Sequence, residues 1–167
     1  TASASETSST AVGAWARAGK AGTALGSASY AHAPFSTSVG MSAYVNPKAS
    51  NGVAVGSWAK ADALNSVALG TGAQATHRYS VALGQQSGTT RENEVYIGYD
   101  SGVTNPASPR VPDKTRVLGG VSDGTRDTDA ATVGQLNRKA DEVYSDVSGR
   151  IAAEALKARD HTATVAA

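Results

Sequence analysis

The feature that most constrains this chain is a repeat of about fourteen residues, marked by the phrase SVALG at residues 66–70 and again at 80–84. Weaker copies upstream and downstream align on the glycine of that phrase. The aligned glycines are Gly13, Gly26, Gly40, Gly56, Gly70, Gly84 and Gly98, with spacings of 13, 14, 16, 14, 14 and 14 residues. A period of this length predicts a repeat architecture, in which each copy adds one structural unit to a stack.

Each repeat predicts two short strands. Large or β-branched residues stand one and three positions before the glycine, and in the first six copies the residue between them is Ala or Ser. Such alternation with a period of two is typical of a strand. A second set of small residues, three and five positions after the glycine, predicts the second strand. We therefore expect a mainly β fold, a parallel β-roll whose narrow interior admits only small side chains.

The large residues of the first strand are expected to point out of the roll. Stacked over the coils, they form a long apolar stripe of the kind that a soluble monomer rarely leaves in water. Identical chains around a rotation axis are the simplest cover for such a stripe. The interface residues predicted in the roll are Val53, Val55, Val67, Leu69, Val81, Leu83, Val95 and Ile97.

The pattern changes after the repeats. The segment TNPASPRVPDKT, at about 104–115, is rich in proline and predicts an irregular insertion, because proline cannot donate to a strand ladder. The glycine-rich segment 116–137 leads into a helix, for which Thr132 and Gln135 have the spacing of a capping box. Apolar residues then recur at intervals of 3, 4, 3 and 4, which predicts a coiled-coil seam. The seam residues predicted as interface are Val133, Leu136, Val143 and Val147.

Composition narrows the classes of function. The chain has no cysteine, which excludes disulfides, thiolate catalysis and cysteine metal sites, and its net charge of +1 without a basic run does not indicate nucleic-acid binding. No signal peptide or transmembrane helix is recognisable, so this segment is not expected to span a membrane. An interior built mainly of Ala and Ser buries little apolar area, so we expect association to supply stability.

The SVALG repeats, the segment VLGGVSDGTRDTDAATVGQLN at 117–137 and the heptad seam together resemble YadA-like trimeric autotransporter adhesins. The neck pattern of that family, G-x-x-x-x-D-A-x-x-V-x-Q-L, falls on Gly124, Asp129, Ala130, Val133, Gln135 and Leu136. The resemblance implies a left-handed, homotrimeric β-roll head over residues 1–115, a neck over 116–137 and the start of a trimeric coiled-coil stalk over 138–167.

The same resemblance implies a function and a location. It implies an adhesin on the bacterial cell surface, anchored in the outer membrane through a missing C-terminal region. Its partner would be a host cell-surface or extracellular-matrix protein, and no cofactor is expected. Because Thr1 begins within the rhythm of a repeat, we expect the chain to be a piece of a longer protein.

Two motifs suggest enzymes but lack the required context. The phrase GTGAQA at 70–75 is similar to a dinucleotide fingerprint, yet a further strand rather than a helix is expected to follow it. The phrase GVSDG at 120–124 matches a nucleophile elbow, which needs a large central sheet and a downstream histidine. His161 lies in a C-terminal tail expected to fray and is a poor candidate. We therefore predict no catalytic residues and no cofactor site.

Metal binding is also not expected. Asp123, Asp127 and Asp129 do not have the spacing of a calcium-binding EF-hand loop, and we expect them to cap backbone groups or to pair with neighbouring chains. His32 and His77 have no second ligand at metal spacing. Both histidines are expected to be solvated in turns.

Aromatic residues recur at fixed repeat positions. Trp15 and Trp58 follow the glycine by two residues, and Tyr30 and Tyr44 follow it by four. Exposed aromatics at regular spacing would suit a protein-binding face. Alternatively, each ring only covers the backbone of an adjacent coil.

Two other classes of function stay open from the sequence. A passive fibre or spacer segment of a bacterial or phage appendage would carry the same repeats. Left-handed β-helix acyltransferases are also trimers, but their repeat is built on hexapeptides, and fourteen is not a multiple of six.

Overall fold

The computed structural model describes residues 1–98 and 115–165, and of Asp160 and residues 162–165 the backbone only. The chain forms two compact units, Thr1–Arg116 and Val117–Ala167. Apart from its last residue, the predicted proline-rich insertion at about 104–115 lies outside the described residues.

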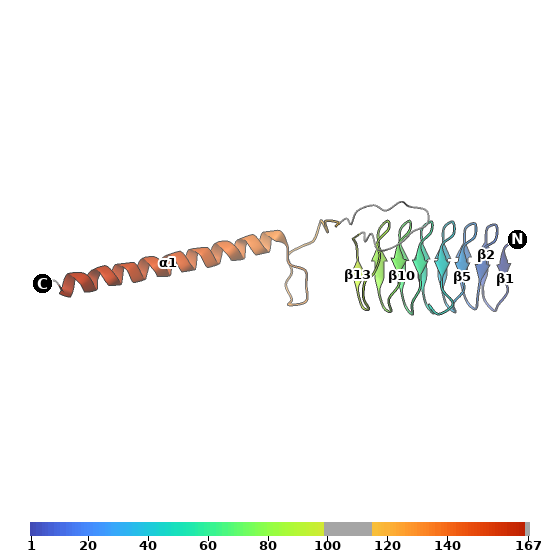
Figure 1. Cartoon of the computed structure of the whole chain (residues 1–167), viewed down its shortest axis with the longest axis horizontal. Coiled ribbons are helices and arrows are strands. Elements are labelled where there is room, and N and C mark those ends of the chain that lie inside the picture. The colour runs from blue at the N-terminus through green and yellow to red at the C-terminus, as the bar shows by residue number, and fades with distance from the viewer. Residues whose placement is uncertain (99–114, 166–167) are drawn as a thin grey trace. The chain divides into compact units, whose positions relative to one another are not determined.

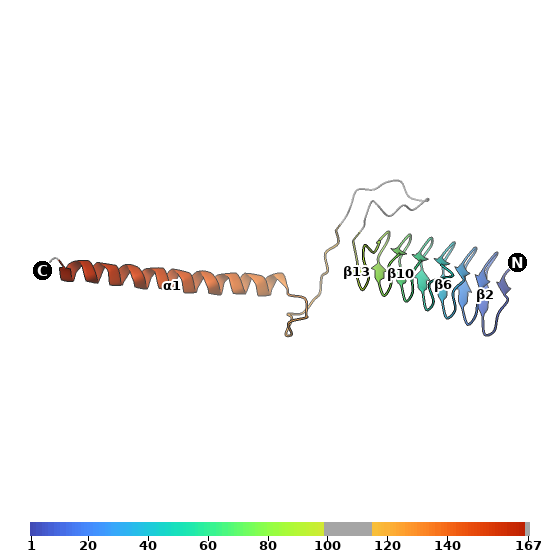
Figure 2. The same ribbon diagram turned by 60° about the horizontal axis from the view of Figure 1, so that its bottom comes forward.

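Short parallel strands build the first unit as a β-solenoid, with two strands in most coils (Figures 1 and 2). The strands are β1 (Ser3–Ala4), β2 (Thr10–Val12), β3 (Arg17–Ala18), β4 (Thr23–Leu25), β5 (Tyr30–Ala31), β6 (Thr37–Val39), β7 (Tyr44–Val45), β8 (Val53–Val55), β9 (Lys60–Ala61), β10 (Val67–Leu69), β11 (Gln74–Ala75), β12 (Val81–Leu83) and β13 (Val95–Tyr96). The predicted mainly β, parallel roll is confirmed.

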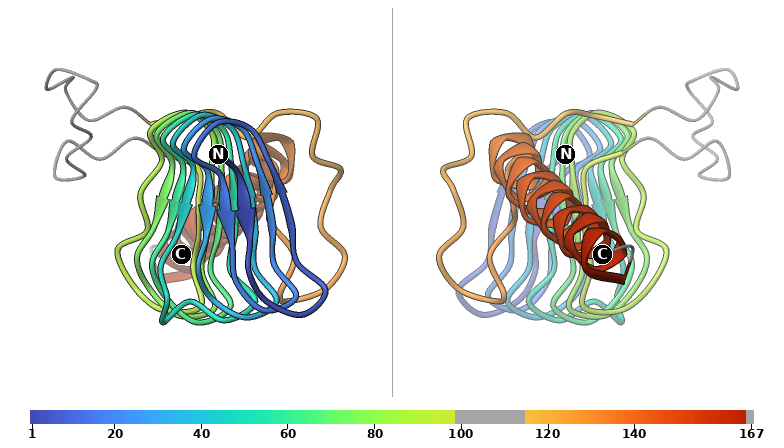
Figure 3. Two further views of the ribbon diagram at one scale, coloured as in Figure 1. Left: turned by 90° about the vertical axis from the view of Figure 1, so that its right-hand side faces the viewer. Right: turned by 90° about the vertical axis from the view of Figure 1, so that its left-hand side faces the viewer.

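The strands form two sheets that make opposite walls of the roll. The six-stranded sheet has the order β1-β3-β5-β7-β9-β11, and the seven-stranded sheet has the order β13-β12-β10-β8-β6-β4-β2. Equivalent repeat positions pair directly: Val67 lies opposite Val53 on one side and Val81 on the other. Seen end-on, successive coils follow one another with little change of outline (Figure 3).

Small side chains fill the interior, as the repeat predicts. The middle residues of β8, β10 and β12, which are Ala54, Ala68 and Ala82, are completely buried, while their neighbours in each strand are partly or fully exposed. Serines at inward positions bond across the interior; the Ser29 hydroxyl lies 2.8 Å from that of Ser38. Among the described residues, no buried side-chain nitrogen or oxygen lacks a partner. The interior is therefore filled and hydrogen-bonded within one chain.

The repeat glycine is required by both conformation and space. Gly70 has a φ of +128°, and a Cβ atom built on it would lie 2.6 Å from the carbonyl carbon of Gly84 in the next coil. A real Cβ cannot approach backbone so closely. The glycine column therefore lets adjacent coils stack in contact at this corner.

Two further corners of the coils carry non-glycine residues in the left-handed conformation, except that Gly72 stands at one of them. The φ values of the non-glycine residues lie between +51° and +64°. The residues are Trp15, Ala28, Ser42, Trp58 and Gln86 at one corner, and Ser8, Ala21, Phe35, Asn51, Asn65, Tyr79 and Asn93 at the other. Apart from Asn, these residue types rarely adopt this conformation, so the stacking of the coils must impose it.

Arg116 lies at the C-terminal end of the roll and bonds to its last coils. Its guanidinium donates to the carbonyl oxygen of Ile97 and, at 2.5 Å, to that of Gln85. In earlier coils the equivalent carbonyls, those of Leu69 and Thr71, accept backbone N–H groups of the following coil at 2.7 and 2.8 Å. The Arg116 side chain thus provides the donors that a further coil would supply.

The second unit contains one helix, α1 (Val133–Val165). Thr132 caps it: its hydroxyl accepts the Gln135 N–H, and the Gln135 side chain accepts the Thr132 N–H, both at 3.1 Å. The predicted capping box is confirmed. The same Gln135 amide also donates to the Gly124 carbonyl at 2.7 Å and accepts the Gly124 N–H at 2.9 Å, which ties the preceding segment to the helix start.

Candidate interaction surfaces

The outer face of the seven-stranded sheet presents the predicted interface residues of the roll. Leu83 and Val95 are exposed, by 44% and 65%. The other predicted residues are partly exposed in the single chain; they are Val53, Val55, Val67, Leu69, Val81 and Ile97. Because their columns stack in register, this wall is a continuous apolar face that a second protein surface can cover. That identical chains cover it is a prediction, since one chain is described.

The helix exposes its predicted seam even more strongly. Val133, Leu136, Val143 and Val147 are exposed by 74%, 67%, 53% and 46%. Leu136, Ala140, Val143 and Val147 line one shallow apolar hollow along the helix. An apolar seam of this kind is stable in water only against another helix or a protein surface.

Tyr30 and Tyr44 lie next to each other on the outer face of the six-stranded sheet, where β5 pairs with β7. Their rings meet edge to face, with centroids 6.5 Å apart. His32 stacks on Tyr30 at 5.3 Å and meets the edge of Tyr44 at 5.6 Å. His32 was expected to be solvated in a turn; although exposed, it belongs instead to this aromatic cluster, because the coils bring residues fourteen apart into contact.

Cations lie at both ends of this aromatic cluster. The guanidinium carbon of Arg17 lies 6.0 Å from the Tyr30 ring centre, and the Lys60 ammonium lies 6.0 Å from that of Tyr44. Partial burial and the nearby Arg17 charge lower the pKa of His32, which favours the neutral ring. Lys60 also forms an ion pair with Asp62 at 2.8 Å.

Trp15 and Trp58 lie on a corner of the roll rather than on the tyrosine face. Both have left-handed backbones, with φ of +64° and +62°, and their exposures are 63% and 40%. The two indoles are three coils apart in the register of the repeat. The four predicted adhesive residues therefore lie on two neighbouring parts of the surface rather than in one patch.

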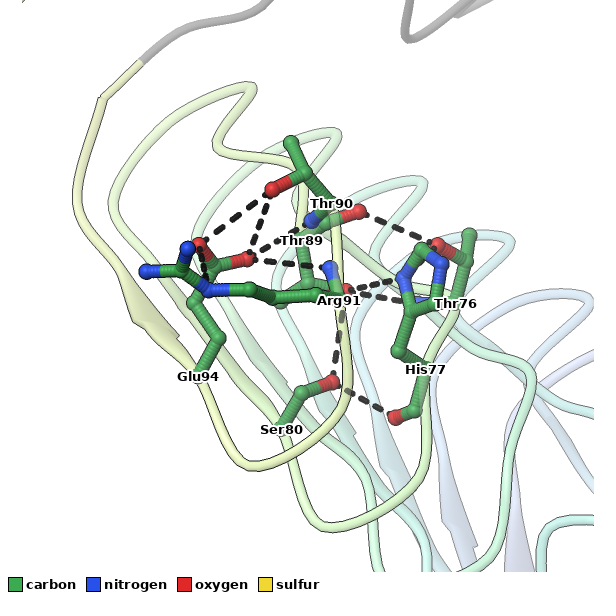
Figure 4. Close-up of polar contacts among 7 residues, drawn as sticks. All are labelled: Thr76, His77, Ser80, Thr89, Thr90, Arg91 and Glu94. Carbon is green, nitrogen blue, oxygen red and sulfur yellow. Dashed lines mark hydrogen bonds and ion pairs between the residues drawn. The ribbon is translucent and has the colours of Figure 1, made fainter.

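A polar cluster fills the last coils of the roll (Figure 4). Thr89 is buried at the position where most earlier coils carry alanine, and its hydroxyl lies 3.3 Å from the His77 Nδ1. The Thr76 hydroxyl lies 3.0 Å from the same nitrogen, and Ser80 donates to the His77 carbonyl at 2.6 Å. His77 was expected to be solvated in a turn; it lies in a bend and is partly exposed, and the hydroxyls of Thr76 and Thr89 contact its ring. Ser80 is fully buried and bonded to backbone, so it cannot act as a nucleophile.

Glu94 closes the other side of the same cluster. Its carboxylate accepts the Thr90 N–H at 2.7 Å and pairs with Arg91 at 3.5 Å. Burial acts to raise the pKa of Glu94, but donation by Thr90 and Arg91 outweighs it and holds the pKa below its usual value. This carboxylate orders the turn before β13 and is not a free acid or base.

The aspartates before the helix are held by donors of their own chain. The Asp129 carboxylate accepts the N–H groups of Thr125 and Arg126, each at 3.0 Å, and these bonds lower its pKa. Asp123 accepts the Thr132 hydroxyl at 2.6 Å and pairs with Arg138. The capping expected for Asp129 is confirmed, while the partner of Asp123 lies within its own chain.

Two other predicted neck residues pack closely. A Cβ atom on Gly124 would lie 2.8 Å from the Ala130 carbonyl oxygen, so this position needs glycine.

Within residues 1–98 and 115–165, no group of three histidine, aspartate or glutamate side chains could hold a metal ion. No helix in the described part of the chain is long and apolar enough to cross a membrane.

Known proteins of similar sequence and structure share this architecture. The YadA head domain repeat matches residues 18–43, 48–73 and 63–87. The crystal structure of the collagen-binding domain of the Yersinia adhesin YadA is 34% identical, with a TM-score of 0.52, over 84% of this chain and 87% of that one. The immunoglobulin-binding proteins EibC and EibD of Escherichia coli are each 65% identical over 48 residues, which is 29% of this chain. The match spans only 10% of EibC and 9% of EibD.

Proposed function

Since this chain belongs to the family of YadA-like trimeric autotransporter adhesins, we propose that it attaches a bacterium to host cells or extracellular matrix. The observation that carries the proposal is the 34% identity with an adhesin domain over 84% of the chain. The related domains are adhesins and not enzymes.

In this proposal three copies assemble around one axis. The outer columns of the seven-stranded sheet and the seam of α1 are the two apolar surfaces that assembly would bury. Residues 1–115 then act as the head, 116–137 as the neck and 138–167 as the start of the stalk. The stalk would continue to an outer-membrane anchor in a missing C-terminal region and hold the head away from the cell surface.

The partner is proposed to be a host cell-surface or extracellular-matrix protein. Because the relatives are a collagen-binding domain and immunoglobulin-binding proteins, collagen and immunoglobulin are the first candidates. The adhesive residues proposed are Trp15, Tyr30, Tyr44 and Trp58, all of which lie outside the predicted trimer interface. Three identical faces would add many weak contacts through avidity.

Binding to immobilised collagen, to immunoglobulin and to cultured cells tests this function directly. The wild-type chain should bind at least one of these surfaces, and a Trp58→Ala, Tyr44→Ala variant should bind it more weakly. Phe35→Ala with Tyr79→Ala is the matched control, because these aromatics are exposed on the other left-handed corner. If the wild-type chain binds no host surface, the passive spacer is the better description.

A further inference from the structure

Two coils of the roll carry nearly the same five-residue phrase, WARAG at 15–19 and WAKAD at 58–62. In both, the tryptophan lies on a left-handed corner and the next residue is a fully buried alanine. The cation of each phrase, Arg17 in β3 and Lys60 in β9, lies in the outward column of the six-stranded sheet. The repeat thus presents the same tryptophan and cation twice, three coils apart.

The fifth residue makes the two copies different. In the second copy, Asp62 neutralises Lys60 through the 2.8 Å ion pair and also accepts the Asn46 amide at 3.4 Å. In the first copy Gly19 stands at this position and supplies no carboxylate. Arg17 has no acidic partner among the residues that the structure describes. Its charge is therefore available to a ligand, whereas that of Lys60 is not.

A hollow of about 370 Å³ adjoins the Arg17 side chain. Trp15, Arg17 and His32 line it together with the serines Ser3 and Ser5. Glu6 is the one acidic residue in the described lining, and Thr1 also contributes. The volume lies within the range of small-ligand pockets.

We propose that this hollow binds a sugar that carries a carboxylate, such as the terminal acidic sugar of a host glycan. The Arg17 guanidinium provides a forked pair of donors that matches a carboxylate. The Trp15 indole offers a flat apolar surface to the C–H face of a sugar ring. Serine hydroxyls and the neutral His32 ring can exchange hydrogen bonds with ring hydroxyls. This inference rests on the proposed adhesin function and names a ligand class for one site on the head.

The test compares 3′-sialyllactose with lactose, which lacks the carboxylated sugar. Each is titrated into the full chain with an acetylated N-terminus, so that the Thr1 ammonium contributes no charge, and the Trp15 indole N–H signal is followed by NMR. Saturable binding of sialyllactose, at least tenfold tighter than that of lactose, is expected. Equal binding of the two sugars, or equal binding of an acidic peptide of the same charge, would overturn the proposal.

The repeat supplies matched control variants. Arg17→Gln should weaken binding at least tenfold, whereas Lys60→Gln at the equivalent position should leave it unchanged. Trp15→Ala should weaken it and Trp58→Ala should not. Glu6→Gln should strengthen it, because the lining carboxylate repels the ligand. Retained affinity in Arg17→Gln would overturn the assignment of the site.

Attachment to sialidase-treated cells separates this inference from the adhesin function. If wild-type attachment persists without the terminal acidic sugars and sialyllactose does not bind in solution, this site is refuted and the adhesin function stands. If the chain attaches to no cell or matrix, the proposed function fails, while sialyllactose titration still decides the site.

Discussion

The roll and the helix differ in how their apolar side chains are buried. In the roll, the inward columns of Ala and Ser are completely buried within one chain, and only the outer columns need a partner. In α1, every described side chain is exposed except Gln135, which is partly covered. A helix without tertiary packing has little stability of its own. The comparison indicates that the roll can fold around its own interior, whereas the helix depends almost entirely on association.

The largest expected effect comes from a charge in the outer apolar column. Val67→Asp should dissociate the proposed trimer, because removing an unpaired charge from water costs about 3–5 kcal/mol for each chain. The roll interior should survive, since Val67 does not face it. Sedimentation equilibrium combined with circular dichroism measures both. A trimer that persists in Val67→Asp would mean that this column is not an interface.

Replacing glycine by alanine should change stability in opposite directions in the two units. Gly70→Ala should destabilise the roll by about 3 kcal/mol, because backbone strain is added to a clash with the next coil. Gly149→Ala should stabilise the helix by about 1 kcal/mol, since nothing lies within 4 Å of the added Cβ. Urea unfolding measures both changes. A tolerated Gly70→Ala would show that the coils are not stacked in contact.

Overpacking the interior should have a smaller effect. Ala68→Leu should cost about 1–3 kcal/mol, because the space between the two sheets holds only small side chains. Ala152→Leu, on the exposed helix, is the matched control and should change stability by less than about 0.5 kcal/mol. Thermal unfolding is a suitable measurement, and equal effects at both sites would contradict a tightly filled roll.

Arg116→Ala should loosen the last coil. Losing two charge-assisted bonds to Ile97 and Gln85 at an exposed site should cost about 1 kcal/mol. Hydrogen exchange should accelerate at residues 84–97 and not in the first coils. Arg78→Ala, which also removes an exposed cation, is the control and should leave exchange unchanged. Uniform exchange in both variants would show that Arg116 does not terminate the roll.

The smallest predicted effect is a pH dependence of the turn that Asp129 holds before α1. Because the folded pKa of Asp129 lies below its unfolded value, its bonds to Thr125 and Arg126 stabilise the turn above the ordinary aspartate pKa of 3.8. That contribution is lost as the pH falls through the lowered, folded pKa. The amide signals of Thr125 and Arg126 should report this loss in NMR titration. In Asp129→Asn the transition should disappear; if it remains, another group causes it.

The architecture of the roll could be predicted because the repeat shows which side chains point inward and which point outward. Alternation around Ala68 identifies an inward small residue between two outward large ones, and identical spacing sets the register of neighbouring coils. The cap of α1 was also predictable, since Thr132 and Gln135 are three residues apart and interact locally.

Other features depend on contacts that sequence spacing does not reveal. The left-handed corner that precedes each strand of the seven-stranded sheet was missed, although Asn51, Asn65 and Asn93, which tolerate this conformation, offered a signal. Arg116 reaches carbonyls 19 and 31 residues earlier, across a segment without the repeat. Tyr44, which contacts His32, and Thr89, which contacts His77, come from the next coil, so these contacts can be identified only in the stacked structure.

The central claim is that the exposed apolar columns of the roll and the seam of α1 are covered by identical chains. Sedimentation equilibrium over a wide concentration range tests it most directly. The account predicts a stable species of about three times 16.8 kDa. A well-folded monomer at all concentrations would contradict it and would leave both apolar surfaces open to a different partner.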